Sequence, residues 1–373
     1  MKMRTLLLFA ALIASARADL TMSLTPAVQN SARGREIVFS GTLTNTSGSA
    51  KLYLNDIAAI VNTGPATELP LKTNSFFWNV PGVLLPGESY TNSELFRVAL
   101  KTTAPASDYR GVVTIRGGGD MTGNGDLAAA NFAVLSPAVQ VQATDSSAGE
   151  FGPDLGSLQI TRTGGTDVEL SVALTASGTA ASGVDYLALP SLVTIPAGSS
   201  SASLIVTPIP NNIAQGERTA QLTVASSPAY NLGAPTNASV IIHDKPADAW
   251  RFANFGENAN DLAAADSADW DRDGIVNLLE FALGSDPKNG GSESLPSVNR
   301  SGGYLTLTFV PNTAASDVTF LVEGSSDLVT WSTSAAEFVS IGNPLNQLTY
   351  RYPHAISGVD AGFLRLRVTR LQP

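Results

Sequence analysis

The feature that most constrains the fold is a two-residue alternation of apolar and polar side chains in short segments between glycines, prolines and asparagines. In the segment 168–174, valines and leucines at every second position are separated by Glu169, Ser171 and Ala173. Successive side chains of a strand point to opposite faces of a sheet, so this pattern predicts strands with one buried face. The 373 residues include 43% hydrophobic and only 14% charged residues, which favours short strands. We expect an all-β, multidomain fold.

Strand signals and the turn residues between them divide the chain into five parts. The predicted parts are a signal peptide at 1–18, an Ig-like β-sandwich at 19–137, a second domain at 138–244, a helical calcium-loop segment at 245–292 and a small β-domain at 293–373. In the fourth part, Trp250, Phe252 and Phe255 stand near helical spacing. We expect the fourth part to be the one helical stretch.

The first 18 residues have the pattern of a secretory signal. Lys2 and Arg4 precede an apolar run at 6–13, and Ala16 and Ala18 supply small residues before Asp19. A membrane anchor is the alternative, but the run falls short of the ~20 residues that a spanning helix needs. We expect an exported mature chain that begins at Asp19, without a membrane span, located outside the cell, at its surface or in a periplasm.

Charge and cysteine content exclude several kinds of partner and site. The formal net charge of −10 repels phosphate backbones, so we expect no nucleic-acid partner. The sequence has no cysteine, which excludes disulfides, thiolate metal sites and cysteine nucleophiles.

The segment 269–280 has the spacing of a twelve-residue EF-hand-type calcium loop. Acidic residues stand at loop positions 1, 3, 5 and 12, glycine at 6 and a side-chain oxygen at 9. The predicted ligands are Asp269, Asp271, Asp273, the Ile275 carbonyl, Asn277 and Glu280. Gly274 permits the sharp turn, and the crowded carboxylates would repel one another without a cation. Oxygen ligands alone indicate Ca²⁺ rather than zinc or copper.

The alternative is that Asp273 or Asn277 only caps the helix that follows, because Asp and Asn are preferred N-cap residues. The loop also resembles the calcium segment of dockerin domains and the EF-hand-like pieces between β-domains of secreted bacterial proteins. A dockerin has a second loop, which this sequence lacks. For an unpaired loop we expect weak binding, in the ~10⁻⁴ to 10⁻³ M range of extracellular modules, and a structural role.

The part 138–244 carries four short motifs in a fixed order. They are A-G-E at 148–150, G-T-A-A-S-G-V-D-Y at 178–186, V-T-I-P-A-G at 193–198 and G-E at 216–217. This order resembles Calx-beta domains, a resemblance that implies a seven-stranded Ig-like sandwich with an acidic calcium site at one end. Its acidic positions correspond to Glu150, Asp185 and Asp244.

The sequence departs from the Calx-beta pattern before the sixth strand, where Asn211, Asn212 and Gln215 stand in place of acidic residues. Fewer carboxylates weaken a calcium site. The second set therefore has two interpretations: a second calcium site, or acidic loop residues that are only solvated.

No sequence pattern marks a catalytic centre, and we predict that the chain is not an enzyme. Its two histidines, His243 and His354, stand at a strand end and in a turn. No nucleophile elbow, zinc-protease helix or phosphate loop is present. Carboxylate pairs that meet only in space leave no such pattern, so a hydrolase remains an alternative.

The main functional hypothesis is a secreted calcium-binding structural or adhesion-type protein, in which sandwiches act as spacers and the loop 269–280 stiffens a joint. The alternative is a carbohydrate- or polymer-binding accessory module, with Trp78, Trp270 and Trp331 as a stacking surface. The expected partners are a calcium ion and an unknown extracellular protein or polysaccharide.

Overall fold

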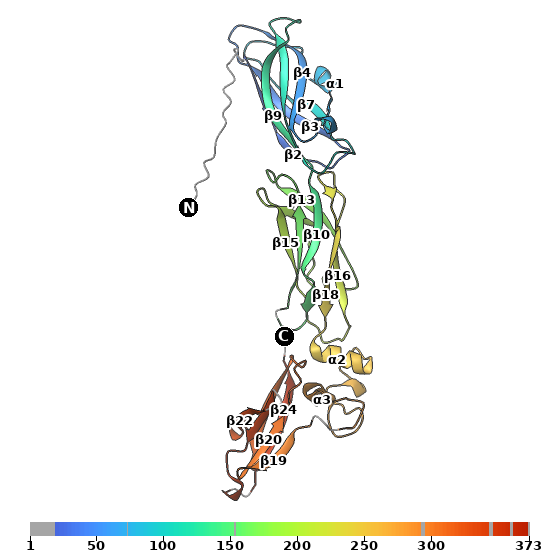
Figure 1. The fold of residues 1–373 in the computed structure, drawn as a ribbon, viewed down its shortest axis with the longest axis vertical. Helices are drawn as coiled ribbons and strands as arrows, with labels where there is room; N and C mark the ends of the chain where they lie inside the picture. Colours follow the sequence, from blue (N-terminus) through green and yellow to red (C-terminus); the bar gives the residue numbers. More distant parts are fainter. Residues whose placement is uncertain are drawn as a thin grey trace.

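The computed structural model describes residues 19–72, 74–152, 154–291, 295–342, 346–358 and 361–371. The predicted signal peptide at 1–18 lies outside the described residues. In Figure 1 three β units follow one another, with the helices α2 (Pro246–Phe255) and α3 (Asn277–Leu283) between the second and the third. The chain is therefore an all-β, multidomain protein of tandem Ig-like sandwiches, with a short helical insert before a C-terminal β-domain. This confirms the predicted fold class.

The first unit is a sandwich of two sheets, ordered β1-β3-β7-β5 and β2-β9-β8-β4-β6. Its strands are β1 (Leu20–Leu24), β2 (Val28–Asn30), β3 (Glu36–Asn45), β4 (Leu52–Thr63), β5 (Leu71–Lys72), β6 (Val83–Leu84), β7 (Ser89–Ala99), β8 (Asp108–Gly118) and β9 (Gly125–Leu135), with the 3₁₀ turn η1 (Ala66–Glu68). Every second residue of β3 is buried, as the alternation requires.

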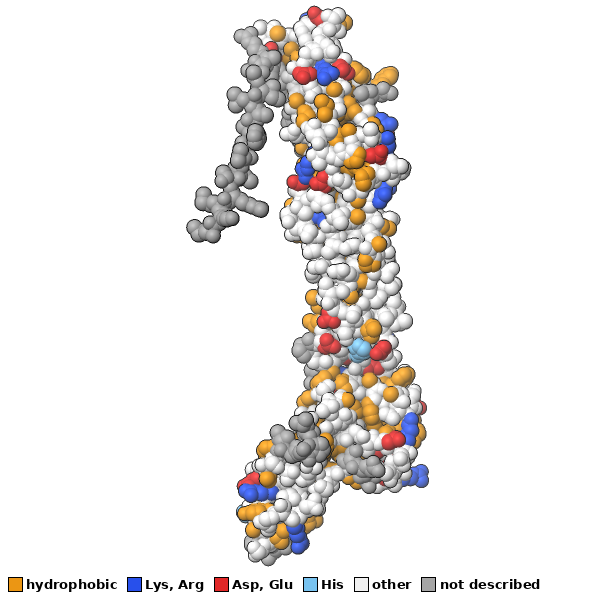
Figure 2. Space-filling model, viewed as in Figure 1, with side chains coloured by type: hydrophobic (Ala, Val, Ile, Leu, Met, Phe, Trp, Pro, Cys, Tyr) orange, Lys and Arg blue, Asp and Glu red, His pale blue; other side chains and the backbone are white. Residues whose placement is uncertain are grey.

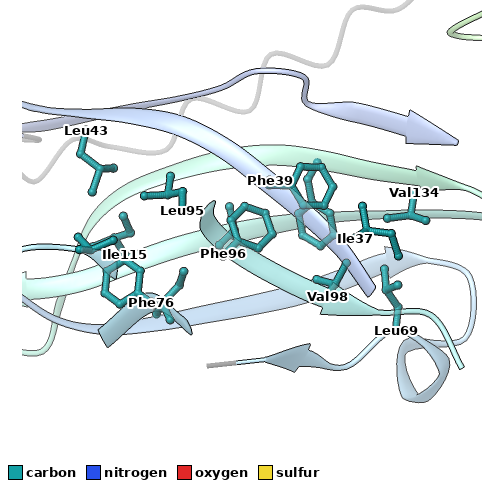
Figure 3. Close-up of a cluster of buried hydrophobic side chains, with 14 of the residues drawn as sticks. Ile37, Phe39, Leu43, Leu69, Phe76, Leu95, Phe96, Val98, Ile115 and Val134 are labelled. Atoms are coloured by element: carbon teal, nitrogen blue, oxygen red, sulfur yellow. The ribbon is translucent and has the colours of Figure 1, made fainter. Parts of the chain in front are cut away.

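A ring cluster fills the space between these sheets (Figure 3). Phe39 stacks on Phe96 with ring centroids 4.7 Å apart, and Phe132 meets both rings edge-on at 5.4 and 5.5 Å. Phe39 and Phe96 are fully buried. These contacts join β3, β7 and β9, so the cluster ties the two sheets together.

Helix α1 (Asn74–Asn79) shows that the expectation of a single helical stretch is wrong. Six residues are too few to display a helical period in the sequence, and an isolated helix of this length is unstable in water. Phe76 is only 1% exposed and packs into the first core, whereas Trp78 is 87% exposed. Burial of the Phe76 side chain therefore stabilises a helix that the sequence pattern does not predict.

The second unit is also a two-sheet sandwich, ordered β15-β12-β10-β17 and β11-β18-β16-β13-β14. Its strands are β10 (Ala138–Asp145), β11 (Ser147–Gly149), β12 (Gly156–Arg162), β13 (Leu170–Ser177), β14 (Leu192–Ile195), β15 (Ser201–Val206), β16 (Arg218–Val224), β17 (Asn231–Leu232) and β18 (Asn237–His243). Leu170, Val172 and Leu174 are buried while Glu169 and Ser171 are exposed, which confirms the predicted alternation.

Polar contacts connect the first sandwich to the second. The carboxylate of Asp108 accepts a hydrogen bond from the Gly165 backbone at 2.7 Å, and Arg110 forms an ion pair with Asp167. A Cβ on Gly165 would stand 2.5 Å from Oδ2 of Asp108, so a larger residue there would displace this carboxylate. On the other side of the joint, the amide of Asn231 donates to the Ser136 hydroxyl at 2.9 Å.

The last part combines the helical insert with two small sheets, β19-β20-β23-β22 and β21-β24. Its elements after α2 are η2 (Leu262–Ala264), α3, β19 (Ser297–Ser301), β20 (Tyr304–Phe309), β21 (Val318–Ser325), η3 (Thr333–Ala335), β22 (Glu337–Gly342), β23 (Gln347–Arg351), η4 (Ile356–Gly358) and β24 (Phe363–Arg370). Ala247 of α2 and Phe281 of α3 share a core with Val318 of β21. The insert therefore packs on the C-terminal sheets.

None of the described helices is long and apolar enough to cross a membrane. The sheets group as β1–β9, β10–β18 and β19–β24, and we keep 19–137, 138–244, 245–292 and 293–373 as proposed domain boundaries.

Replacing Phe96 with alanine is expected to destabilise the first sandwich by about 3–5 kcal/mol, because it removes a ring from a packed cluster and leaves a cavity. Calorimetric unfolding of the chain measures the loss. Phe77→Ala is the control: that ring is 54% exposed, so its removal is expected to leave the transition nearly unchanged. Equal effects of the two substitutions would contradict the packing described.

Candidate metal centre

The loop 269–280 is shaped by hydrogen bonds from its backbone to its own carboxylates. Asp269 accepts bonds from the N–H groups of Arg272 at 2.7 Å and Gly274 at 2.9 Å. Asp273 accepts from Ile275 at 2.8 Å. Gly274 has φ +93°, and Arg272 also lies in the left-handed region with φ +63°. The chain therefore curls tightly around the side chains of its acidic residues.

Three of the predicted ligands lie close together. Asp269, Asp271 and Asp273 each bring one carboxylate oxygen into a group whose members lie within 4.8 Å of one another. Oδ2 of Asp271 is buried and has no hydrogen-bond partner among the described residues. A buried carboxylate oxygen without a partner is costly, and a cation would offset that cost.

Glu280 lies on the first turn of α3 and is only 1% exposed. Burial, together with the nearby charges of Asp271, Asp273 and Asp269, raises the pKa of Glu280 from 4.5 to about 7. Its Oε2 finds no hydrogen-bond partner in the part of the chain that the structure describes. Among the described residues, the fourth carboxylate of the loop thus has no ion-pair partner.

Asn277 is oriented by two hydrogen bonds and keeps one oxygen unpaired. Its amide nitrogen donates to the carbonyl oxygens of Ala263 at 3.0 Å and Ala265 at 2.8 Å. Its Oδ1 is buried and, within the described ranges, unpartnered. The N-cap residue of α3 is Val276 and no side chain caps this helix, so the capping alternative for Asp273 or Asn277 is wrong. The assignment of the Ile275 carbonyl as a ligand stays a prediction.

A buried ion-pair network connects this loop to the C-terminal sheet. The Asp266 carbonyl accepts from the Leu278 N–H at 3.1 Å, and its carboxylate pairs with Arg370 of β24 at 2.6 Å. Arg370 also lies 2.7 Å from Asp248 of α2, which pairs with Arg251 at 2.6 Å. Asp248 and Arg251 are each 1% exposed. Asp248 and Arg251 stand three residues apart on α2, but Arg370 stands more than 100 residues further along the chain, so no sequence spacing indicates the complete network.

The second acidic set also comes together, but around an arginine. Glu150 and Asp185 are 2% and 4% exposed, and both pair with the guanidinium of Arg218. Asp244, 7% exposed, accepts backbone bonds from Gln215 and Gly216 at 2.7 Å each. The interpretation as merely solvated loop acids is therefore wrong. Burial raises the pKa of Glu150 to about 7 and also raises that of Asp244.

The three tryptophans proposed as a stacking surface lie on separate parts of the chain. Trp78 belongs to α1 of the first sandwich, and in Figure 1 the second sandwich lies between α1 and α2. Trp270 packs against Phe255 with ring centroids 4.8 Å apart, and Arg365 covers Trp331 at 4.2 Å. Trp78 therefore shares no surface with the other two rings.

Figure 2 shows blue basic side chains in small separate groups beside red acidic ones, and the second sandwich is mostly white. Binding to a nucleic-acid backbone requires a basic patch or stripe. The described residues on this face form none, and the absence of a nucleic-acid partner stays a prediction from the net charge of −10.

No protein-family model matches the chain, and neither does any curated protein. Among solved structures, the apo-form Calx CBD1 domain is 19% identical over 28% of this chain and 96% of its own, with a TM-score of 0.25. The I9–I11 tandem of titin is 6% identical, and the match covers 94% of this chain and 98% of the titin chain with a TM-score of 0.27. Invasin, a bacterial integrin-binding protein, is 13% identical, and the match covers 95% of this chain and 60% of the invasin chain with a TM-score of 0.25. These likenesses concern the β-sandwich fold alone.

Replacing Glu280 with glutamine is expected to stabilise the calcium-free protein at pH 8. The folded-state pKa of about 7 lies above the ordinary 4.5, so the stability contributed by the protonated carboxyl is present below pH 4.5 and lost as the pH rises through 7. Glutamine removes that loss, and we expect a melting temperature a few degrees above wild type in chelator. Melting curves between pH 4 and 8 measure it.

The matched control is Glu257→Gln, which changes an exposed acid just after α2 and is expected to have no effect. If Glu280→Gln instead lowered the melting temperature in chelator at pH 8, Glu280 would be held by a protein contact rather than lacking one.

Proposed function

We propose that this chain is an exported, calcium-binding structural protein of the adhesion type, in which one calcium ion in the loop 269–280 fixes the helical insert against the C-terminal β-domain. One observation carries the proposal: three buried oxygens of this loop, from Asp271, Asn277 and Glu280, are unpartnered within the described ranges. Buried oxygens without a partner are unfavourable, and a hard divalent ion is a partner that suits them.

The donor set points to calcium. Carboxylate and amide oxygens of Asp269, Asp271, Asp273, Asn277 and Glu280 supply hard ligands, and Glu280 can contribute two of them. A single loop of this kind corresponds to dissociation constants of ~10⁻⁴ to 10⁻³ M, which favours occupancy outside the cell rather than in the cytosol. Export by the segment 1–18 belongs to the same proposal.

The ion would act as a brace. Glu280 lies on α3, whose Phe281 packs beside Val318 of the C-terminal sheet. The segment that enters the loop is paired through Asp266 with Arg370. Drawing both ends of the loop onto one ion therefore tightens two contacts with the same domain. The braced C-terminal β-domain then presents its surface to an extracellular protein or polysaccharide.

Calcium titration calorimetry on the mature chain tests the site. We expect one weak binding event in wild type and none in Asp269→Ala/Glu280→Ala, because the double variant removes both ends of the donor set. Glu257→Ala, which removes a nearby exposed acid, is expected to bind as wild type does. Identical heats in wild type and the double variant would refute the calcium site.

The brace is tested separately with Arg370→Ala. We expect calcium to bind this variant still, but to protect the C-terminal domain less from limited proteolysis, because Asp248 and Asp266 keep Arg251 but lose the arginine that ties them to β24. The matched control is Arg367→Ala on the same strand, whose side chain is 50% exposed. Equal protection of both variants by calcium would argue against this route.

A further inference from the structure

The end of the second sandwich nearest α2 gathers three buried carboxylates from separate segments. Glu150 follows β11, Asp185 lies between β13 and β14, and Asp244 follows β18. All three are at least nine-tenths buried. Buried charges of one sign repel one another, and a cation placed among them offsets that repulsion.

That cation is already present in the chain. Arg218 begins β16, and its side chain is 11% exposed. Nη2 lies 3.3 Å from Oε1 of Glu150, and Nη1 pairs with Oδ2 of Asp185. The two terminal nitrogens thus bind carboxylates from two different loops, as one metal ion would. The planar guanidinium, with several N–H donors, suits binding to two carboxylates at once.

The other polar groups add to this arrangement but leave one carboxylate oxygen unpaired, because Oδ1 of Asp244 is buried and has no hydrogen-bond partner among the described residues. Oδ2 of Asp244 is satisfied by the N–H groups of Gln215 and Gly216, and the Asn211 amide donates to Glu150 at 2.8 Å. Lys245 donates to Asn212 at 2.8 Å and adds a second positive charge. A divalent ion entering here would meet both cationic side chains, and it would have to displace the guanidinium.

We infer that Arg218 is a built-in replacement for calcium: it holds Glu150 and Asp185 together permanently, and the second sandwich binds no divalent ion while Arg218 is present. This replaces the earlier expectation of a second calcium site at Glu150, Asp185 and Asp244. The site is latent, and removal of the guanidinium opens it to calcium.

This assignment makes the two joints on either side of α2 different. Asp244 directly precedes Lys245, the N-cap residue of α2, so this joint is anchored to the second sandwich by the hydrogen bonds of Asp244 with the Gln215 N–H and of Lys245 with the Asn212 side chain. It stays intact at any calcium concentration. This inference does not depend on whether the loop 269–280 binds calcium.

The test uses the full mature chain carrying Asp269→Ala/Glu280→Ala, which removes the proposed loop site. In this background we expect no calcium binding by calorimetry while Arg218 is present. Adding Arg218→Gln is expected to lower the melting temperature by several degrees in chelator and to create one calcium-binding event. Millimolar calcium is expected to restore the lost melting temperature. Arg218→Lys, which keeps a positive charge, is expected to show no calcium binding by calorimetry.

Two results would overturn the inference. One is calcium binding with Arg218 intact that disappears on Asp185→Asn; the other is no calcium binding by Arg218→Gln at up to 10 mM. If Arg218→Gln is unfolded in chelator, the same titration is followed by circular dichroism. Refolding by calcium then supports the latent site, and its absence refutes it.

Discussion

Buried carboxylates must meet a positive charge, a proton or a metal ion, and the joints around α2 solve this requirement in different ways. Glu150 and Asp185 meet the guanidinium of Arg218 at the end of the second sandwich. Asp248 meets Arg251 and Arg370 between α2 and the C-terminal sheet. Glu280 meets no cation among the described residues, and its neighbours are acidic.

This difference separates what holds each domain from what holds the domains together. The cores are apolar and continuous within each sandwich, as the stacked rings of Phe39 and Phe96 illustrate. The joints add polar contacts: Asp108 accepts a hydrogen bond from the Gly165 backbone, and Arg370 bridges two aspartates beside the apolar core that α2 and α3 share with β21. Apolar burial therefore sets the stability of each unit, while hydrogen bonds and ion pairs, which depend on direction and charge, set the geometry between units.

The strands and the calcium-loop pattern were open to prediction because each is a local signal. The alternation of apolar and polar residues predicts that Leu170, Val172 and Leu174 are buried. The calcium-loop pattern places all of its oxygen-donor residues within the twelve positions 269–280. Helix α1 was not predicted, because a six-residue helix is too short to show a helical repeat of apolar residues, and burial of Phe76 stabilises it. Arg218 was missed for another reason: it stands 68 residues from Glu150, and only folding brings them together.

The sequence by itself determined the all-β class, the tandem arrangement and the residue types of the calcium loop, since these follow from neighbours along the chain. Tertiary structure alone decided which buried charges are compensated from within. It paired Arg218 with two distant loops, joined Asp266 to Arg370, and left the oxygens of Asp271 and Glu280 without a protein partner in the described ranges. The reason is physical: the energy of a buried charge depends on what surrounds it in space, and sequence spacing does not record that.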